Sequence, residues 1–190
     1  MTTESPASGS LLLGITFVRI LLVPVVMGLV LLGPDHSAAY TLAAVIFALA
    51  AATDFVDGYL ARRWARTTTF GSFLDTTADK LLVSGVLIAL VDVGRASPWI
   101  AIIIIGRELL ILGLRGVVAA DGTVFPPSIW GKLKTNVQFA AILLAILRWD
   151  KPLGPLFLDE WAMIVAAVVT VMSAVEYMTR FSSALSEGSS

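Results

Sequence analysis

Long apolar stretches separated by short polar connectors run through the whole chain, and this pattern predicts six membrane helices. A membrane-spanning helix needs roughly 20 predominantly apolar residues, and glycine, proline, aspartate and serine gather in the connectors between the stretches. The predicted helices cover residues 10–32, 37–61, 72–93, 98–118, 129–147 and 156–178. We therefore expect an all-α integral membrane protein, a bundle of six transmembrane helices. Its predicted parts are a flexible N-terminus (1–9), a transmembrane domain (10–180) and a flexible C-terminal tail (181–190).

The composition supports a location in lipid. Hydrophobic residues make up 57% of the 190 positions and charged residues 14%, whereas soluble domains carry about 25% charged residues. Six helices leave room only for short loops and tails, so we expect no separate soluble domain. The chain has no cysteine, which excludes disulfides, thiolate metal sites and a cysteine nucleophile.

The positive charges predict which connectors face the cytoplasm, because cytoplasmic loops are enriched in lysine and arginine. Arg62, Arg63 and Arg66 lie between the second and third predicted helices, and the stretch around the fourth connector is also basic. The connectors of the opposite side carry fewer basic residues and several acidic ones. We therefore expect a multi-pass protein of the plasma membrane with both termini in the cytoplasm.

Two pairs of aspartates flank the connector between the second and third helices. Asp54 and Asp57 are three residues apart, and Asp75 and Asp79 are four residues apart, so each pair shares one helix face. Carboxylates near a bilayer repel one another and are costly to desolvate. A divalent cation removes this conflict, and oxygen ligands suit Mg²⁺ or Mn²⁺. The pairs predict a metal site on the cytoplasmic side. A carboxylate-lined cation transporter is the competing class.

Small residues and an arginine accompany the aspartates and favour an enzyme. Gly58, Ala61 and Gly71 let a ligand approach the backbone closely. Arg62 can bind two phosphate oxygens through its planar guanidinium. These residues suit a nucleotide, whereas a cation pore has no evident use for them.

The complete string D-x₂-D-G-x₂-A-R-x₈-G-x₃-D-x₃-D, which spans residues 54–79, resembles the signature of the CDP-alcohol phosphatidyltransferases. The resemblance implies a six-helix membrane enzyme, usually a homodimer, that transfers a phosphatidyl group from a CDP-linked lipid to an alcohol and releases CMP. It implies Asp79 as the catalytic base and two bound Mg²⁺ or Mn²⁺ ions. The implied metal ligands are Asp54, Asp57, Asp75 and Asp79. The implied CDP-binding residues are Gly58, Ala61, Arg62 and Gly71.

Charged residues of the fourth and fifth predicted helices indicate which kind of alcohol accepts the phosphatidyl group. Arg107 and Glu108 lie within the fourth apolar stretch, and Arg115 follows Glu108 by seven residues, so the latter two share nearly one helix stripe. Buried charges in a membrane pair or line a polar cavity. Lys132 and Lys134 lie at the start of the fifth helix. With Arg115 they form either a basic pocket for a phosphorylated acceptor or simple cytoplasmic anchors.

Further segments resemble the phosphatidylglycerophosphate synthase branch of the same family. They are Thr16–Arg19 with Pro24, Gly106–Glu108, Leu114–Arg115 and Trp130–Thr135. Leu13 departs from this branch, which often has asparagine there.

This branch uses CDP-diacylglycerol and glycerol 3-phosphate, while inositol phosphate and phosphatidylglycerol are the rival acceptors. The candidate phosphate-binding residues are Arg107, Arg115, Lys132 and Lys134. The expected partners are these substrates, membrane lipid and a second copy of the chain, and no nucleic acid.

One further charged residue and one charged pair carry structural expectations. Arg19, in the first predicted helix, is expected to reach the cytoplasmic headgroup region. Glu176 and Arg180 are four residues apart near the end of the last helix, which predicts an ion pair of small value.

Overall fold

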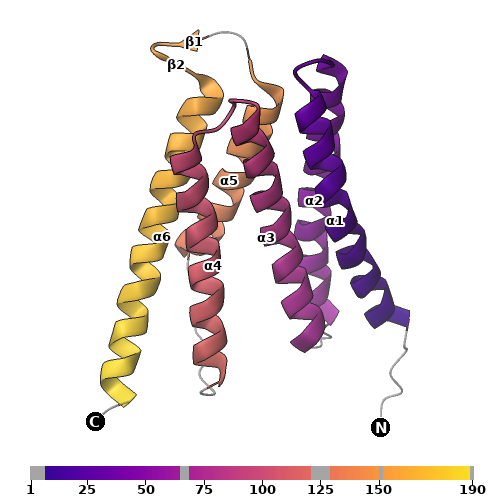
Figure 1. The fold of residues 1–190 in the computed structure, drawn as a ribbon. Coiled ribbons are helices and arrows are strands. Elements are labelled where there is room, and N and C mark those ends of the chain that lie inside the picture. Colours follow the sequence, from indigo (N-terminus) through magenta and orange to yellow (C-terminus); the bar gives the residue numbers. More distant parts are fainter. Residues whose placement is uncertain (1–6, 65–68, 121–128, 150–151, 189–190) are drawn as a thin grey trace. The chain divides into compact units, whose positions relative to one another are not determined.

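The computed structural model describes residues 7–64, 69–120, 129–149 and 152–188, and these residues are almost entirely helical (Figure 1). Side chains are described for residues 14–53, 73–117, 130–131, 133–149 and 152–182. The helices are α1 (Ala7–Leu32), α2 (Ser37–Trp64), α3 (Thr69–Asp92), α4 (Pro98–Ala120), α5 (Ile129–Leu147) and α6 (Leu158–Gly188). The predicted all-α class and the order of the helices are confirmed.

Helix boundaries follow the apolar pattern closely, with one clear exception. Helix α5 begins and ends where the sequence predicted. Helix α6 continues to Gly188, well beyond the predicted end at residue 178. The prediction stopped where the apolar residues stop, but a helix continues through polar residues because its hydrogen bonds are formed by the backbone.

A small hairpin lies between α5 and α6, where the sequence predicted a connector followed by a helix from residue 156, so the predicted start of the sixth helix is two residues too early. Strand β1 (Pro152–Leu153) pairs antiparallel with β2 (Leu156–Phe157). The two-residue loop between them begins with Gly154 at a φ of 72°, a conformation that favours glycine at the first loop position. Trp161 Nε1 donates to the Leu153 carbonyl over 3.0 Å and so attaches the hairpin to α6.

The chain divides into two compact units, Met1–Val93 and Gly94–Ser190. In the first unit, α1 packs against both α2 and α3. Val26 and Val30 of α1, Phe47 of α2 and Val86 of α3 are buried there. The α1–α3 contact is close at Gly85, where an added Cβ would lie 2.8 Å from Val23 Cγ1.

In the second unit, α4 and α5 each pack against α6. The buried apolar residues include Ile104 of α4, Ile142 and Ile146 of α5, and Met163 of α6. Arg95, which precedes α4, donates from Nη1 to the Ile146 carbonyl over 2.6 Å. This contact satisfies a carbonyl in the last turn of α5, which has no partner within the helix.

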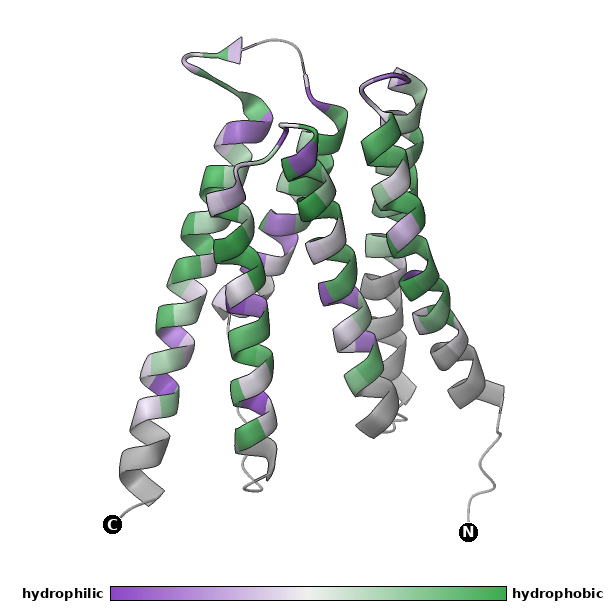
Figure 2. Ribbon diagram, viewed as in Figure 1, coloured by the Kyte–Doolittle hydropathy of each residue, from purple (hydrophilic) through white to green (hydrophobic). Residues whose placement is uncertain are grey.

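Apolar side chains also face outward on most helices, as expected for contact with lipid. Figure 2 shows mostly hydrophobic ribbons interrupted by short hydrophilic bands. Within the described residues, two segments are long and apolar enough to span a membrane, Gly14–Leu32 and Leu158–Ser182. The charged residues Asp75, Asp79 and Lys80 interrupt α3, and α4 is interrupted in the same way. The prediction of six spanning helices therefore stays a prediction.

Candidate functional site

The aspartate motif lies on two consecutive helices of the first unit. Asp54 and Asp57 are in the C-terminal part of α2, and Asp75 and Asp79 are in the N-terminal part of α3. The helical spacing predicted for each pair is confirmed, since all four backbones are helical. The structure describes the side chains of only two motif residues, Asp75 and Asp79. The predictions for the other motif residues concern side chains outside the described ones: Asp54, Asp57, Gly58, Ala61, Arg62 and Gly71.

Asp75 and Asp79 converge on a single buried arginine from the neighbouring helix. Arg19 of α1 donates from Nη1 to Asp75 Oδ1 and to Asp79 Oδ1, each over 2.9 Å. The Arg19 side chain is 2% exposed, whereas those of Asp75 and Asp79 are 38% and 27% exposed. The expectation that Arg19 extends to the lipid headgroups is therefore wrong. A charge placed within an apolar helix finds its partner in the carboxylates beside it.

The same geometry tests whether these residues fit a divalent cation. Both Oδ1 atoms lie within 2.9 Å of one nitrogen, so the two carboxylates can direct oxygen atoms at one positive centre. Carboxylate oxygens are the hard ligands that Mg²⁺ and Mn²⁺ prefer. Among the described side chains, no group of three or more acidic or histidine residues gathers. Asp75 and Asp79 therefore fit the role of metal ligands predicted for them. The other two predicted ligands, Asp54 and Asp57, have side chains outside the described ones.

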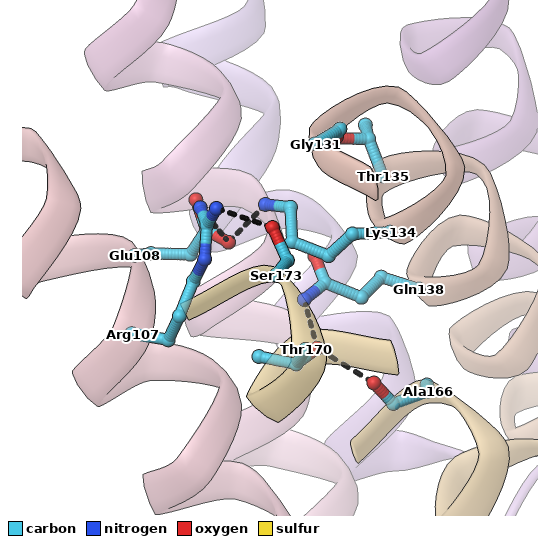
Figure 3. Close-up of polar contacts among 9 residues, drawn as sticks. All are labelled: Arg107, Glu108, Gly131, Lys134, Thr135, Gln138, Ala166, Thr170 and Ser173. Atoms are coloured by element: carbon cyan, nitrogen blue, oxygen red, sulfur yellow. Dashed lines mark hydrogen bonds and ion pairs between the residues drawn. The ribbon is translucent and has the colours of Figure 1, made fainter. Parts of the chain in front are cut away.

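A second polar cluster lies in the other unit, within apolar helices (Figure 3). Glu108 of α4 and Lys134 of α5 are buried, with 4% and 5% of their surfaces exposed. Lys134 Nζ donates to Glu108 Oε1. Arg107 Nη1 lies 3.5 Å from the same oxygen, and Arg107 Nη2 donates to Ser173 Oγ of α6 over 2.7 Å. One carboxylate therefore neighbours two cations.

Three polar residues of this region were not identified from the sequence. Gln138 Nε2 donates to Thr170 Oγ1 over 2.8 Å, and Thr170 in turn donates to the Ala166 carbonyl over 2.6 Å. Ser173 is the partner of Arg107 described above. The available signal was spacing, because Gln138 follows Lys134 by four residues and Ser173 follows Thr170 by three, which places each pair on one helix face.

The structure brings together two of the four predicted phosphate-binding residues. Arg107 and Lys134 meet at Glu108. Arg115 lies further along α4, with Cζ 5.9 Å from the centroid of the Tyr177 ring, a distance typical of a cation–π contact. The side chain of Lys132 lies outside the described ones. A buried cluster with two cations and one anion can bind a further anion, and phosphate is well matched to arginine.

Comparisons with known proteins connect both clusters to one family. The family model described as CDP-alcohol phosphatidyltransferase matches residues 13–172. This range includes the aspartate motif and the charged residues Arg107, Glu108 and Lys134 of the second cluster.

Among curated proteins, the chain is 40% identical to the CDP-diacylglycerol–glycerol-3-phosphate 3-phosphatidyltransferase of Bacillus subtilis, over 87% of this chain and 92% of the relative. It is 42% identical to a probable phosphatidylglycerophosphate synthase of Mycobacterium tuberculosis, over 87% of this chain and 78% of the relative. A Haemophilus influenzae protein with the same name as the Bacillus relative is 36% identical, over 86% of this chain and 89% of the relative.

Proposed function

This chain belongs to the CDP-alcohol phosphatidyltransferase family, and we propose that it transfers a phosphatidyl group from CDP-diacylglycerol to glycerol 3-phosphate, giving phosphatidylglycerophosphate and CMP. The observation that carries the proposal is similarity over most of the chain to several proteins named for this reaction. The complete aspartate motif at residues 54–79 supports the family's transfer reaction from a CDP-linked lipid.

We further propose that all six helices span the plasma membrane, with the aspartate motif and both termini on the cytoplasmic side. The exposed apolar faces of the helices support insertion into lipid, as at Leu21 of α1 and Ile102 of α4. The arginines that follow the motif support its cytoplasmic placement. By analogy with the family, the working unit is a homodimer.

Asp54, Asp57, Asp75 and Asp79 would hold two Mg²⁺ or Mn²⁺ ions. The convergence of Asp75 and Asp79 on one positive group supports this assignment for half of the site. The bound cations would neutralise the pyrophosphate and stabilise the charge that develops on departing CMP.

The chain's own residues would then bind and orient the two substrates. Arg62, with the small residues around it, holds the CDP group, and Arg107 and Lys134 bind the phosphate of the acceptor. Asp79 accepts the proton of the acceptor hydroxyl. The hydroxyl oxygen forms a bond to the β-phosphorus, and the bond to the CMP oxygen breaks with its electron pair.

The test is CMP release by the purified full-length protein in detergent with CDP-diacylglycerol and Mg²⁺ or Mn²⁺. Glycerol 3-phosphate, inositol phosphate and phosphatidylglycerol are supplied in separate reactions. Release with glycerol 3-phosphate alone is the expected result. Release with another acceptor alone retains the chemistry and replaces the acceptor. No release with any acceptor from folded protein, together with cation flux in proteoliposomes, would favour the transporter class.

A further inference from the structure

Large apolar side chains are exposed around the β1–β2 hairpin, at one end of the second unit (Figure 1). Trp149 follows α5 and is 69% exposed, Leu153 lies in β1 and is 60% exposed, and Trp161 lies in the first turn of α6 and is 40% exposed. An indole combines a large apolar ring with one N–H donor, and tryptophan is enriched where lipid meets water. These side chains are therefore typical of the boundary between acyl chains and headgroups.

The charged side chains beside the hairpin are bound to partners within the unit. Arg148 Nη2 donates to Glu160 Oε1 over 3.3 Å, and Arg148 Cζ lies 4.7 Å from the centroid of the Phe157 ring. Glu160 Oε2 also accepts a hydrogen bond from the Phe157 backbone N–H over 2.8 Å. These charges are balanced inside the unit, whereas the exposed tryptophans and Leu153 lie outside the ion pairs.

The apolar face of α6 is continuous with the hairpin and indicates its depth in a bilayer. Exposed apolar residues recur along α6 at helical spacing: Trp161, Ile164, Val165, Val168, Val171, Met172 and Val175. They lie within Leu158–Ser182, which is long and apolar enough to span a membrane. The hairpin ends at Phe157, four residues before Trp161, a distance of roughly 6 Å along a helix. The headgroup layer is about 5 to 7 Å thick on each side of the hydrocarbon core, so the hairpin coincides with it.

A hydrogen bond holds the hairpin at the level of the first turn of α6. Trp161 Nε1 donates to the Leu153 carbonyl over 3.0 Å. A pair of two-residue strands leaves backbone groups unpaired along its outer edges, and such groups are costly in hydrocarbon. The headgroup layer is the depth that suits both the apolar Leu153 side chain and this polar backbone.

We propose that the β1–β2 hairpin is a membrane-interface anchor, in which Leu153, Trp149 and Trp161 insert into the headgroup–acyl boundary of a phospholipid bilayer. The anchor holds the end of α5 and the start of α6 at one depth. Its attraction to lipid is hydrophobic, because the neighbouring charges are paired within the unit. The inference goes beyond the proposed reaction and does not depend on it. It requires only that α6 spans the bilayer.

The test measures the depth of position 153 with a fluorescent label. The chain has no cysteine, so the full-length Leu153→Cys protein can be labelled with an environment-sensitive fluorophore and reconstituted into phosphatidylcholine vesicles. We expect quenching by phosphatidylcholine brominated on the acyl chain near the headgroup, and weak quenching by aqueous iodide supplied on both sides. Asp35→Cys, in the exposed polar turn between α1 and α2, is the control. Its label should show strong iodide quenching, little lipid quenching and emission at a longer wavelength.

A label at Val168 tests the span of α6 separately. Val168 is exposed on the apolar face of α6, so the label of Val168→Cys should be quenched most by lipids brominated near the acyl-chain ends. Lipid quenching at 168, with iodide quenching at 153 equal to that at 35, would place the hairpin in water and overturn the inference alone. Quenching at 153 by neither agent would show that protein covers the hairpin, which also overturns it. No lipid quenching at 168 would reject the span of α6 and the inference with it, while CMP release tests the reaction independently.

Replacing Trp161 separates its hydrogen bond from its ring. Trp161→Phe, made in the labelled Leu153→Cys protein, keeps an aromatic ring and removes the N–H that holds the hairpin, so iodide quenching at 153 should increase. Trp99→Phe makes the same replacement in the first turn of α4 and should leave that quenching unchanged. Equal iodide quenching in the two variants would overturn the role of the Trp161 contact in the anchor.

Discussion

At the scale of single residues, Asp75 and Asp79 of α3 share one buried partner, Arg19 of α1. One nitrogen of Arg19 binds both Asp75 and Asp79 at 2.9 Å. Two carboxylates one helical turn apart would otherwise repel each other. The arginine therefore offsets this repulsion and keeps both carboxylates directed at one point.

Replacing Asp79 with asparagine tests whether this carboxylate is needed for the reaction in a protein that still folds. The amide cannot accept the proton of the acceptor hydroxyl, so CMP release should decrease by about 10²-fold or more. Arg19 retains Asp75 as a charged partner, so the protein should still fold, with a smaller decrease in melting temperature than a change at Arg19 itself would cause. Asp92→Asn, at the exposed end of the same helix, makes the same change in charge and should retain activity. Full activity of Asp79→Asn would remove this residue from the mechanism.

Replacing Arg19 tests the buried ion pairs directly. Arg19→Gln removes the charge-assisted hydrogen bonds to Asp75 and Asp79. A hydrogen bond to a charged group contributes about 1.5 to 3 kcal/mol to stability. The expected result is a lower melting temperature, with most of the loss restored in Arg19→Lys, which keeps a positive charge. An unchanged melting temperature in Arg19→Gln would show that these contacts do not stabilise the first unit.

At the scale of helices, α1 and α3 pack closely because Gly85 has no side chain. An added Cβ would lie 2.8 Å from Val23 Cγ1 and 2.9 Å from Met27 Sδ, so these side chains of α1 must shift to admit it. This contact lies between the same helices that the Arg19 ion pairs join. The packing of α1 on α3 and the position of the aspartates are therefore connected.

Gly85→Ala should consequently destabilise the first unit. Overpacking of this kind costs about 1 to 3 kcal/mol, and alanine in place of glycine returns roughly 1 kcal/mol of helix propensity, so the expected net loss of stability is up to about 2 kcal/mol. Gly113→Ala in α4 is the matched control, because nothing lies within 4 Å of its added Cβ. Thermal unfolding in detergent should show a decrease for Gly85→Ala and no decrease for Gly113→Ala. The opposite order would contradict the close contact.

At the scale of the whole molecule, the local pattern of apolar residues predicts the helices well. It does not predict which side chains of different helices contact one another. The apolar stretches predicted every helix and both ends of α5, because each depends only on neighbouring residues. The spacing of the aspartates predicted their pairing on helix faces for the same reason. The partners of Arg19 are 56 and 60 residues away, and Lys134 is 26 residues from Glu108. Such contacts depend on which helices pack together, which local periodicity does not specify.

The proposed topology can be measured with single cysteines, since the chain contains none of its own. Ser97, before α4, and Ser182, near the end of α6, are both exposed. Six spans with cytoplasmic termini predict that a membrane-impermeant thiol reagent labels Ser97→Cys in intact cells and labels Ser182→Cys only after the membrane is opened. Labelling of both positions in intact cells would place the C-terminal end of α6 outside the cell, on the same side as Ser97. That result would contradict the proposed topology.

The most direct test of the central claim is identification of the lipid product. Purified protein is incubated with CDP-diacylglycerol, carbon-13-labelled glycerol 3-phosphate and Mg²⁺ or Mn²⁺, and the lipids are analysed by mass spectrometry alongside CMP. We expect labelled phosphatidylglycerophosphate in equal amount to CMP, with neither product in the presence of a chelator. CMP without labelled lipid would show transfer to water or to another acceptor, and the claim that glycerol 3-phosphate receives the phosphatidyl group would be wrong.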